Sequence, residues 1–240
     1  VALTVENPLA LAALSGYGSV VAFSGDVHGS VFSVTDVDWT QSGSFGFSNL
    51  VALAGASTLR HGAGFAAGLH IHAVTVTVAS ASSIEVGARG SWPKTETTGR
   101  AGGSYGGRGE YAYGDSCPVY GDALAPAELG SGGRGISLYG DSRGGGLVRI
   151  EADVLTLNGA IRANGQDGPD YCGGGSGGGI RIEAGVLAGA GSLRANGGKA
   201  GYSGGGDGGG GRIAVYAQNA EAFTPSALEA KANAGAGWGT

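Results

Sequence analysis

Apolar and polar residues alternate in short stretches along much of the chain. In the segment 148–152 (VRIEA), the apolar residues occupy one face, and Arg149 and Glu151 occupy the other. Strict alternation of this kind is typical of a half-buried β-strand. Only the alanine-rich stretch 220–230 approaches a helical period. The pattern therefore predicts an all-β protein.

The strand pattern returns at a fixed interval. Residues 145–165 (GGLVRIEADVLTLNGAIRANG) align with residues 177–197 (GGGIRIEAGVLAGAGSLRANG) at an offset of 32, and a shorter third copy begins at Arg212. Repeats of this length stack equivalent positions on one another. We therefore expect the repeated strands to pair in register.

Stacking gives each repeated position a structural role. An aliphatic column would run inside, an asparagine column would bond neighbouring amides at strand ends, and charged columns would lie outside as a ladder of ion pairs. These columns are Ile150, Ile182 and Ile213, then Asn164, Asn196 and Asn233, then Arg149, Glu151, Arg181 and Glu183.

These features predict a right-handed parallel β-helix (a β-solenoid) with glycine-rich loops inserted on one side. An antiparallel sandwich with irregular hairpins is the alternative. Residues 81–240 would form the glycine-rich parallel β-helix. Residues 1–80 would be earlier coils or a capping region, and the whole would be one continuous solenoid.

Glycine supplies 53 of the 240 residues, concentrated in the stretches 99–146, 165–179 and 197–211. Because glycine has no Cβ, neighbouring stretches can approach closely and bond through main-chain amides, although ordering them costs much entropy. Cys117 and Cys172 lie in the first two stretches, and we expect them to form a disulfide worth about 4 kcal/mol. Two free buried thiols are the alternative.

Composition and charge narrow the function classes. A net charge of −5 gives no basic surface for nucleic acid, and no apolar run is long enough to span a membrane. Charged residues make up only 14% of the chain. Low charge, many small residues and the cysteine pair favour an extracellular or cell-surface location. The absence of methionine suggests a mature portion of a longer chain or assembly.

Metal-binding patterns are weak. Aspartates beside glycine could offer oxygen ligands to Ca²⁺, but their spacing fits no known calcium loop, so we expect no metal or cofactor. These candidates are Asp115, Asp141, Asp167 and Asp207. His70 and His72 share one strand face, a spacing that zinc also accepts, although a polar outer face explains them as well.

Tyrosines are frequent in the glycine-rich stretches. An aromatic ring with a hydroxyl can stack on sugars or contact protein surfaces. We expect this set to face outward and to bind a ligand: Tyr105, Tyr111, Tyr113, Tyr120, Tyr139, Tyr171 and Tyr202.

The order of the glycine-rich motifs resembles that in known proteins. The motifs include GGSYGGRG from Gly102, GGGLVRIEA from Gly144, GGGSGGGIRIEA from Gly173 and GGGGRIAVY from Gly208. Across residues 84–216 they resemble the glycine-rich repeat regions of large secreted and cell-surface β-helix proteins. The succession of strands and turns is similar to that of filamentous-haemagglutinin-type adhesins. The resemblance implies a parallel β-helix and supplies no catalytic residue.

The sequence therefore favours a non-catalytic, extracellular structural or adhesive module, with glycans or neighbouring surface or fibre proteins as partners. The alternative is a carbohydrate-active enzyme, a polysaccharide lyase or hydrolase, with acid–base residues on an outer groove. Its candidates would be Arg149, Glu151, Arg181 and Glu183. A regularly repeated column argues against this alternative, because a catalytic centre is a single irregular cluster.

Overall fold

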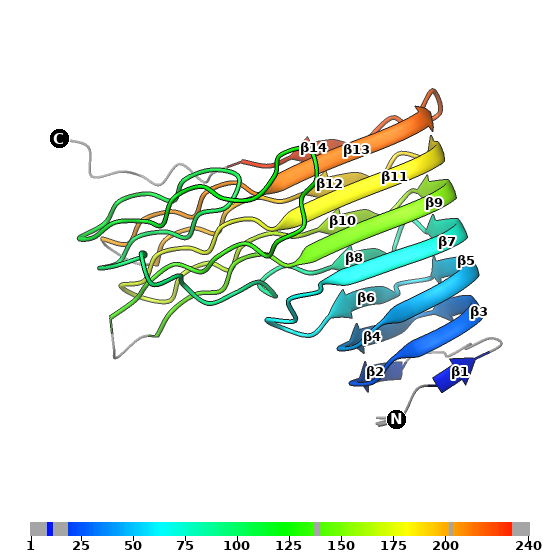
Figure 1. Cartoon of the computed structure of the whole chain (residues 1–240), viewed down its shortest axis with the longest axis horizontal. Coiled ribbons are helices and arrows are strands. Elements are labelled where there is room, and N and C mark those ends of the chain that lie inside the picture. The colour runs from blue at the N-terminus through cyan, green and yellow to red at the C-terminus, as the bar shows by residue number, and fades with distance from the viewer. Residues whose placement is uncertain (1–8, 12–18, 137–139, 202–203, 232–240) are drawn as a thin grey trace.

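The computed structural model describes residues 9–11, 19–136, 140–201 and 204–231. These residues contain fourteen β-strands and no helix, arranged as two parallel sheets. The chain passes from one sheet to the other after every strand. Figure 1 shows the long strands stacked in order from β3 to β13, with the glycine-rich segments extending together from one end of the strands.

The odd-numbered strands form the first sheet, called here the long-strand sheet, in the spatial order β1-β3-β5-β7-β9-β11-β13. Their bounds are β1 Leu9–Leu11, β3 Val27–Thr35, β5 Phe45–Ala54, β7 Leu69–Val78, β9 Leu147–Leu157, β11 Gly179–Ala188 and β13 Arg212–Asn219. The even-numbered strands form the second sheet, in the order β14-β12-β10-β8-β6-β4-β2. Their bounds are β2 Ser19–Phe23, β4 Val37–Gln41, β6 Thr58–His61, β8 Ser83–Glu85, β10 Ala160–Arg162, β12 Ser192–Arg194 and β14 Ala227–Glu229.

The predicted right-handed parallel β-helix is therefore corrected. The described residues form two parallel sheets, and no closed coil of sheets is found among them. Each central repeat supplies one long and one short strand, and its glycine-rich remainder joins neither sheet. Glycine is a poor strand former and has no side chain to pack, so this remainder does not build another sheet. The all-β class and the parallel pairing were predicted correctly.

The repeat predicted the register of the central strands. Ile150 of β9 lies opposite Ile182 of β11, at the expected interval of 32 residues. The third copy is shifted, because Ile182 pairs with Val215 of β13, whereas Ile213 pairs with Ile180. The predicted column therefore ends at Val215 and not at Ile213.

The core lies between the two sheets and changes character along the stack. At the N-terminal end it is aromatic: the Phe32 ring lies 5.3 Å from Trp39 and 4.9 Å from Phe45 between centroids. Further along it is aliphatic, with Ile71 and Ile150 fully buried. β7 pairs with β9, and β8 pairs with β10, so both sheets continue across residue 80 without a break. The described residues hold no helix that is long and apolar enough to cross a membrane.

Asparagines join successive repeats at the ends of the short strands. The Asn196 amide donates to Asn164 Oδ1 at 2.9 Å, and the Lys231 amide donates to Asn196 Oδ1 at 2.8 Å. This is the amide bonding that the sequence predicted for the first two asparagines. Asn233 lies outside the described residues.

The glycine-rich segments pack together beyond the strand ends, in what we call the glycine layer (the described residues of 92–146, 165–178 and 197–211). Within residues 173–178, every third amide donates to the same neighbouring segment, at 2.7–3.0 Å. The donor–acceptor pairs are Gly173–Arg134 and Ser176–Ser131, Gly174–Gly206 and Gly177–Gly209, and Gly175–Gln166 and Gly178–Ala163. Three residues per turn, with all hydrogen bonds made to neighbours, is the pattern of a polyproline II helix.

Close approach explains why this layer needs glycine. A Cβ built on Gly177 would meet the carbonyl oxygen of Ala195, and one on Gly175 would meet the carbonyl oxygen of Arg143. Residues 172–180 are buried throughout. The prediction that the glycine stretches pack side by side through main-chain amides is therefore confirmed.

The predicted disulfide is absent. Cys117 and Cys172 are both free and buried. Cys117 Sγ lies 3.4 Å from Ser131 Oγ, whereas Cys172 Sγ points toward the carbonyl oxygens of Gly133 and Gly173. Each thiol thus has hydrogen-bond partners of its own. The glycine-rich segments are held together by main-chain hydrogen bonds and not by the predicted disulfide.

His61, at the end of β6, joins the two-sheet region to the glycine layer. It accepts a hydrogen bond from the Leu147 amide at Nε2 (3.2 Å) and donates from Nδ1 to the Gly62 carbonyl (2.7 Å). The ring is fully buried. Burial disfavours the imidazolium and lowers the pKa of His61 to about 4. His61 is therefore a neutral link at the point where β9 leaves the glycine layer.

Candidate functional site: a groove across the long-strand sheet

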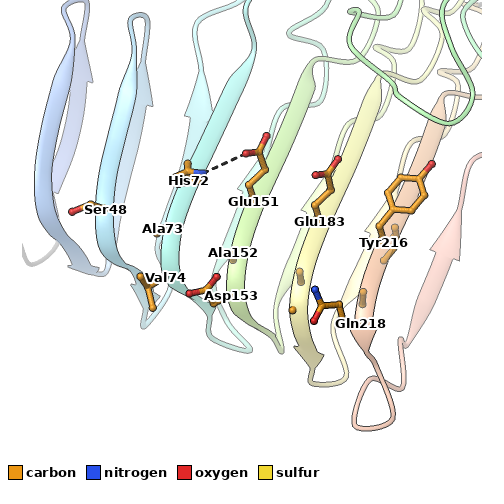
Figure 2. Close-up of a pocket in the computed structure, with 14 residues that line it drawn as sticks. Ser48, His72, Ala73, Val74, Glu151, Ala152, Asp153, Glu183, Tyr216 and Gln218 are labelled. Carbon is orange, nitrogen blue, oxygen red and sulfur yellow. Dashed lines mark hydrogen bonds and ion pairs between the residues drawn. The ribbon is translucent and has the colours of Figure 1, made fainter.

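A groove crosses the outer face of the long-strand sheet, perpendicular to its strands. It has a volume of about 1070 Å³ and runs from β5 to β13 (Figure 2). Its lining residues are Ser48, His72, Ala73, Val74, Glu151, Ala152, Asp153, Glu183, Ala184, Gly185, Val215, Tyr216, Ala217 and Gln218.

The floor of the groove is made of small residues that lie in register. Ala73 pairs with Ala152 of β9, Ala152 with Ala184 of β11, and Ala184 with Ala217 of β13. In β11, Ile182 and Ala184 are buried two residues apart, but the next buried residue, Leu187, follows three residues later. The alternation of inward and outward side chains therefore shifts by one residue after the alanine. Two consecutive residues therefore face outward in each central strand. The groove follows this aligned row of small side chains.

Two histidines of β7 hold a carboxylate of β9. The distances are 3.1 Å from His70 Nε2 to Glu151 Oε1 and 3.3 Å from His72 Nδ1 to Glu151 Oε2. Figure 2 shows the His72 contact at the wall of the groove. Partial burial alone would raise the pKa of Glu151, but the hydrogen bonds from His72 and His70 outweigh it, so the pKa lies below its usual value.

The four residues named for a catalytic role do come together on this face. Arg149 pairs in register with Arg181, and Glu151 with Glu183. Within β11, Arg181 forms an ion pair with Glu183. Arg149 Nε is buried and has no hydrogen-bond partner. The arrangement is the charged ladder that the repeat predicted, except that Glu151 is taken by the two histidines.

Tyr216 lines the groove at the β13 end. Its ring is 43% exposed, and its hydroxyl donates to the Leu124 carbonyl at 2.6 Å. That bond restricts the ring, which Figure 2 shows beside Glu183. Sequence reasoning missed Tyr216, Asp153 and Gln218. The sequence did contain a signal. The same three-residue pattern, with alanine in the centre, occurs at 151–153 (EAD), 183–185 (EAG) and 216–218 (YAQ), and the residue after each alanine is the extra outward one.

The tyrosines predicted to bind a ligand have different environments. Tyr105 is fully buried, so it cannot face outward, and the Tyr120 hydroxyl donates to the Leu129 carbonyl at 2.6 Å. Tyr111 and Tyr113 are exposed, and Arg100 lies 5.0 Å from the Tyr113 ring centre and 4.9 Å from that of Tyr171. Tyr139 and Tyr202 lie outside the described residues. The predicted set is therefore not one surface.

The aspartates considered for calcium have different environments. Asp167 Oδ1 accepts from the Lys199 amide at 2.7 Å, and Asp141 pairs with Arg134 at 3.1 Å. Asp115 is exposed, whereas Asp207 is buried and its Oδ2 has no partner. In the part of the chain that the structure describes, no three His, Cys, Asp or Glu side chains converge as metal ligands.

Comparison of the chain with known protein families, with curated proteins and with solved structures found no match. The functional argument therefore rests on the geometry of the chain itself.

Proposed function

We propose that the chain is a non-catalytic, extracellular structural and adhesive module of a larger surface or secreted protein. Its partners are glycans or neighbouring surface proteins. The observation that carries the proposal is the regularity of the groove, whose alanine floor lies in register across β7, β9, β11 and β13 and whose glutamates lie in register on β9 and β11. A repeated row suits recognition of an extended partner, whereas chemistry needs one distinct cluster.

Rigidity supports the same proposal. The segments of the glycine layer are joined by main-chain hydrogen bonds from every amide of residues 173–178. Three strands of the long-strand sheet begin directly after these segments, at Leu147, Gly179 and Arg212. A surface held in this way keeps its shape when a partner binds, which reduces the entropy lost on binding.

The electrostatics disfavour the enzymatic alternative. A polysaccharide hydrolase needs a carboxylic acid whose pKa is raised, so that it can donate a proton. The pKa of Glu151 is instead lowered by His72 and His70, and Glu183 is engaged by Arg181. The groove therefore supports binding better than general acid catalysis.

A glycan array run beside a polysaccharide-degradation screen tests the proposal. We expect binding to at least one glycan class and no degradation of any polysaccharide. Degradation that is abolished by Glu151→Gln or Glu183→Gln would overturn the non-catalytic assignment. Failure to bind or degrade would remove the adhesive role and leave a structural one.

A further inference from the structure

We propose that the groove binds a single extended strand of an uncharged, β-linked polysaccharide, lying across β5 to β13 with one sugar unit over each strand. This inference rests on the proposed adhesive function and assigns it a site and a ligand class. Three observations lead to it: the spacing of the groove, its charge and its aromatic end.

The spacing favours a polysaccharide over a peptide. Neighbouring strands of a sheet lie about 4.8 Å apart, and an extended β-linked hexose chain advances by about 5 Å per sugar. A ligand running across the strands would therefore meet one residue of the aligned alanine row on each of the strands β7, β9, β11 and β13. An extended peptide advances by about 3.4 Å per residue and loses step with the strands after two or three of them.

The charge of the groove selects against anionic sugars. Three carboxylates line it, those of Glu151, Asp153 and Glu183. Glu151 is held by His70 and His72. Glu183 is held by Arg181. A carboxylate oxygen has two lone pairs, so these groups can still accept hydrogen bonds from sugar hydroxyls, and charge-assisted bonds of this kind are stronger than neutral ones. Because the described lining residues include three carboxylates and no lysine or arginine, uronic acids and sulfated sugars are disfavoured by like charge. Neutral hexoses or N-acetylhexosamines remain as the units that fit.

The ends of the groove differ, which gives the ligand a preferred position. The Tyr216 ring stands at the β13 end, held through its hydroxyl and 43% exposed. An aromatic face beside polar groups suits the apolar face of a sugar ring. Ser48 on β5 marks the opposite end. The groove thus spans five strands, from β5 to β13.

The test is calorimetric titration of the purified chain with oligosaccharides of defined length. Cello-, manno- and N-acetylchito-oligosaccharides of two to seven units are the neutral probes, and oligogalacturonates are the anionic probe. In at least one neutral series, affinity should rise steadily up to about five units and then level off. Oligogalacturonates should bind at least tenfold more weakly. No binding in any neutral series, affinity independent of length, or equal affinity for oligogalacturonates would overturn the inference.

Variants locate the site. Val74→Trp places a bulky side chain in the groove on β7, at a residue that is 46% exposed, and should weaken binding at least tenfold. Val20→Trp makes the same change on β2 of the other sheet, at a residue that is 64% exposed, and should leave binding unchanged. Equal affinities of the two variants for the oligosaccharide would contradict the assignment of the binding site to the groove. If glycans still bound on the array, the adhesive function would stand without this site.

Discussion

The two-sheet region and the glycine layer are both buried, but different groups fill their interiors. In the two-sheet region, alternation sends Ile, Leu, Val and Phe side chains between the sheets, and burial of their apolar surface is the dominant stabilising contribution. In the glycine layer, the backbone itself is the packed surface. Its segments are held by main-chain hydrogen bonds that point to three neighbours in turn.

This difference predicts opposite tolerance to substitution. A side-chain core accepts a change of one methyl group at modest cost, because neighbouring side chains adjust. A backbone core has no side chain to adjust. An added methyl group meets carbonyl oxygens that are already committed to hydrogen bonds.

The largest expected effect is that of Gly177→Ala. Its Cβ would meet the Ala195 carbonyl oxygen and would lie 2.6 Å from the Gly211 amide nitrogen. We expect the free energy of unfolding to fall by about 4 kcal/mol, at the severe end for a single substitution. Urea denaturation gives the magnitude. Hydrogen exchange should show the amides of 173–178 losing protection before those of β5 and β7.

Two substitutions serve as controls for Gly177→Ala. Gly107 also lies in the glycine layer, but its nearest neighbour would be the Gly210 nitrogen at 3.1 Å, so Gly107→Ala should cost less than about 1 kcal/mol. Ile150→Val in the two-sheet region should cost about 1 kcal/mol. If all three variants were equally stable, the contrast between the regions would be wrong.

A smaller effect is expected from acidification, through the link between the two regions. His61 has a pKa of about 4 in the folded chain and about 6.5 when unfolded, so between these values only the unfolded chain binds the proton. Its contribution is complete above about pH 6.5 and is lost as the pH falls toward 4, by about 3 kcal/mol in total. Urea denaturation from pH 7.5 to 4 measures it.

The matched variant is His61→Gln, which keeps an acceptor for the Leu147 amide and does not titrate. It should be less stable than the original chain at pH 7, and its stability should fall less steeply between pH 6.5 and 4. Identical pH dependence in the two proteins would show that His61 does not link the regions as a neutral group.

Much of the two-sheet region could be predicted from the sequence. The 32-residue repeat predicted that Ile150 lies opposite Ile182, because a parallel stack places equivalent residues side by side. The number of sheets could not be read in this way. Nothing in the repeat itself shows whether its glycine-rich third forms a strand or a main-chain-bonded layer, since both are extended and unpatterned.

The groove was only half predictable. The charged ladder of Glu151 and Glu183 follows from the alternation within each repeat. The histidine contacts do not, because β7 and β9 are separated by the whole first glycine stretch and share no repeat motif. Tyr216 was hidden for a related reason, since the shift in the third copy obscured its position opposite Glu183.

The smallest expected effect concerns the two thiols and separates covalent from main-chain support of the glycine layer. Because Cys117 and Cys172 are free, adding reductant should leave the melting temperature unchanged. Burial raises the pKa of Cys172 to about 11, so its thiolate is scarce at pH 8 and the native protein should resist iodoacetamide. Mass spectrometry should find two alkylated cysteines only after denaturation. A melting temperature that drops by several degrees in reductant would instead mean that a disulfide, and not the main-chain network, holds the layer.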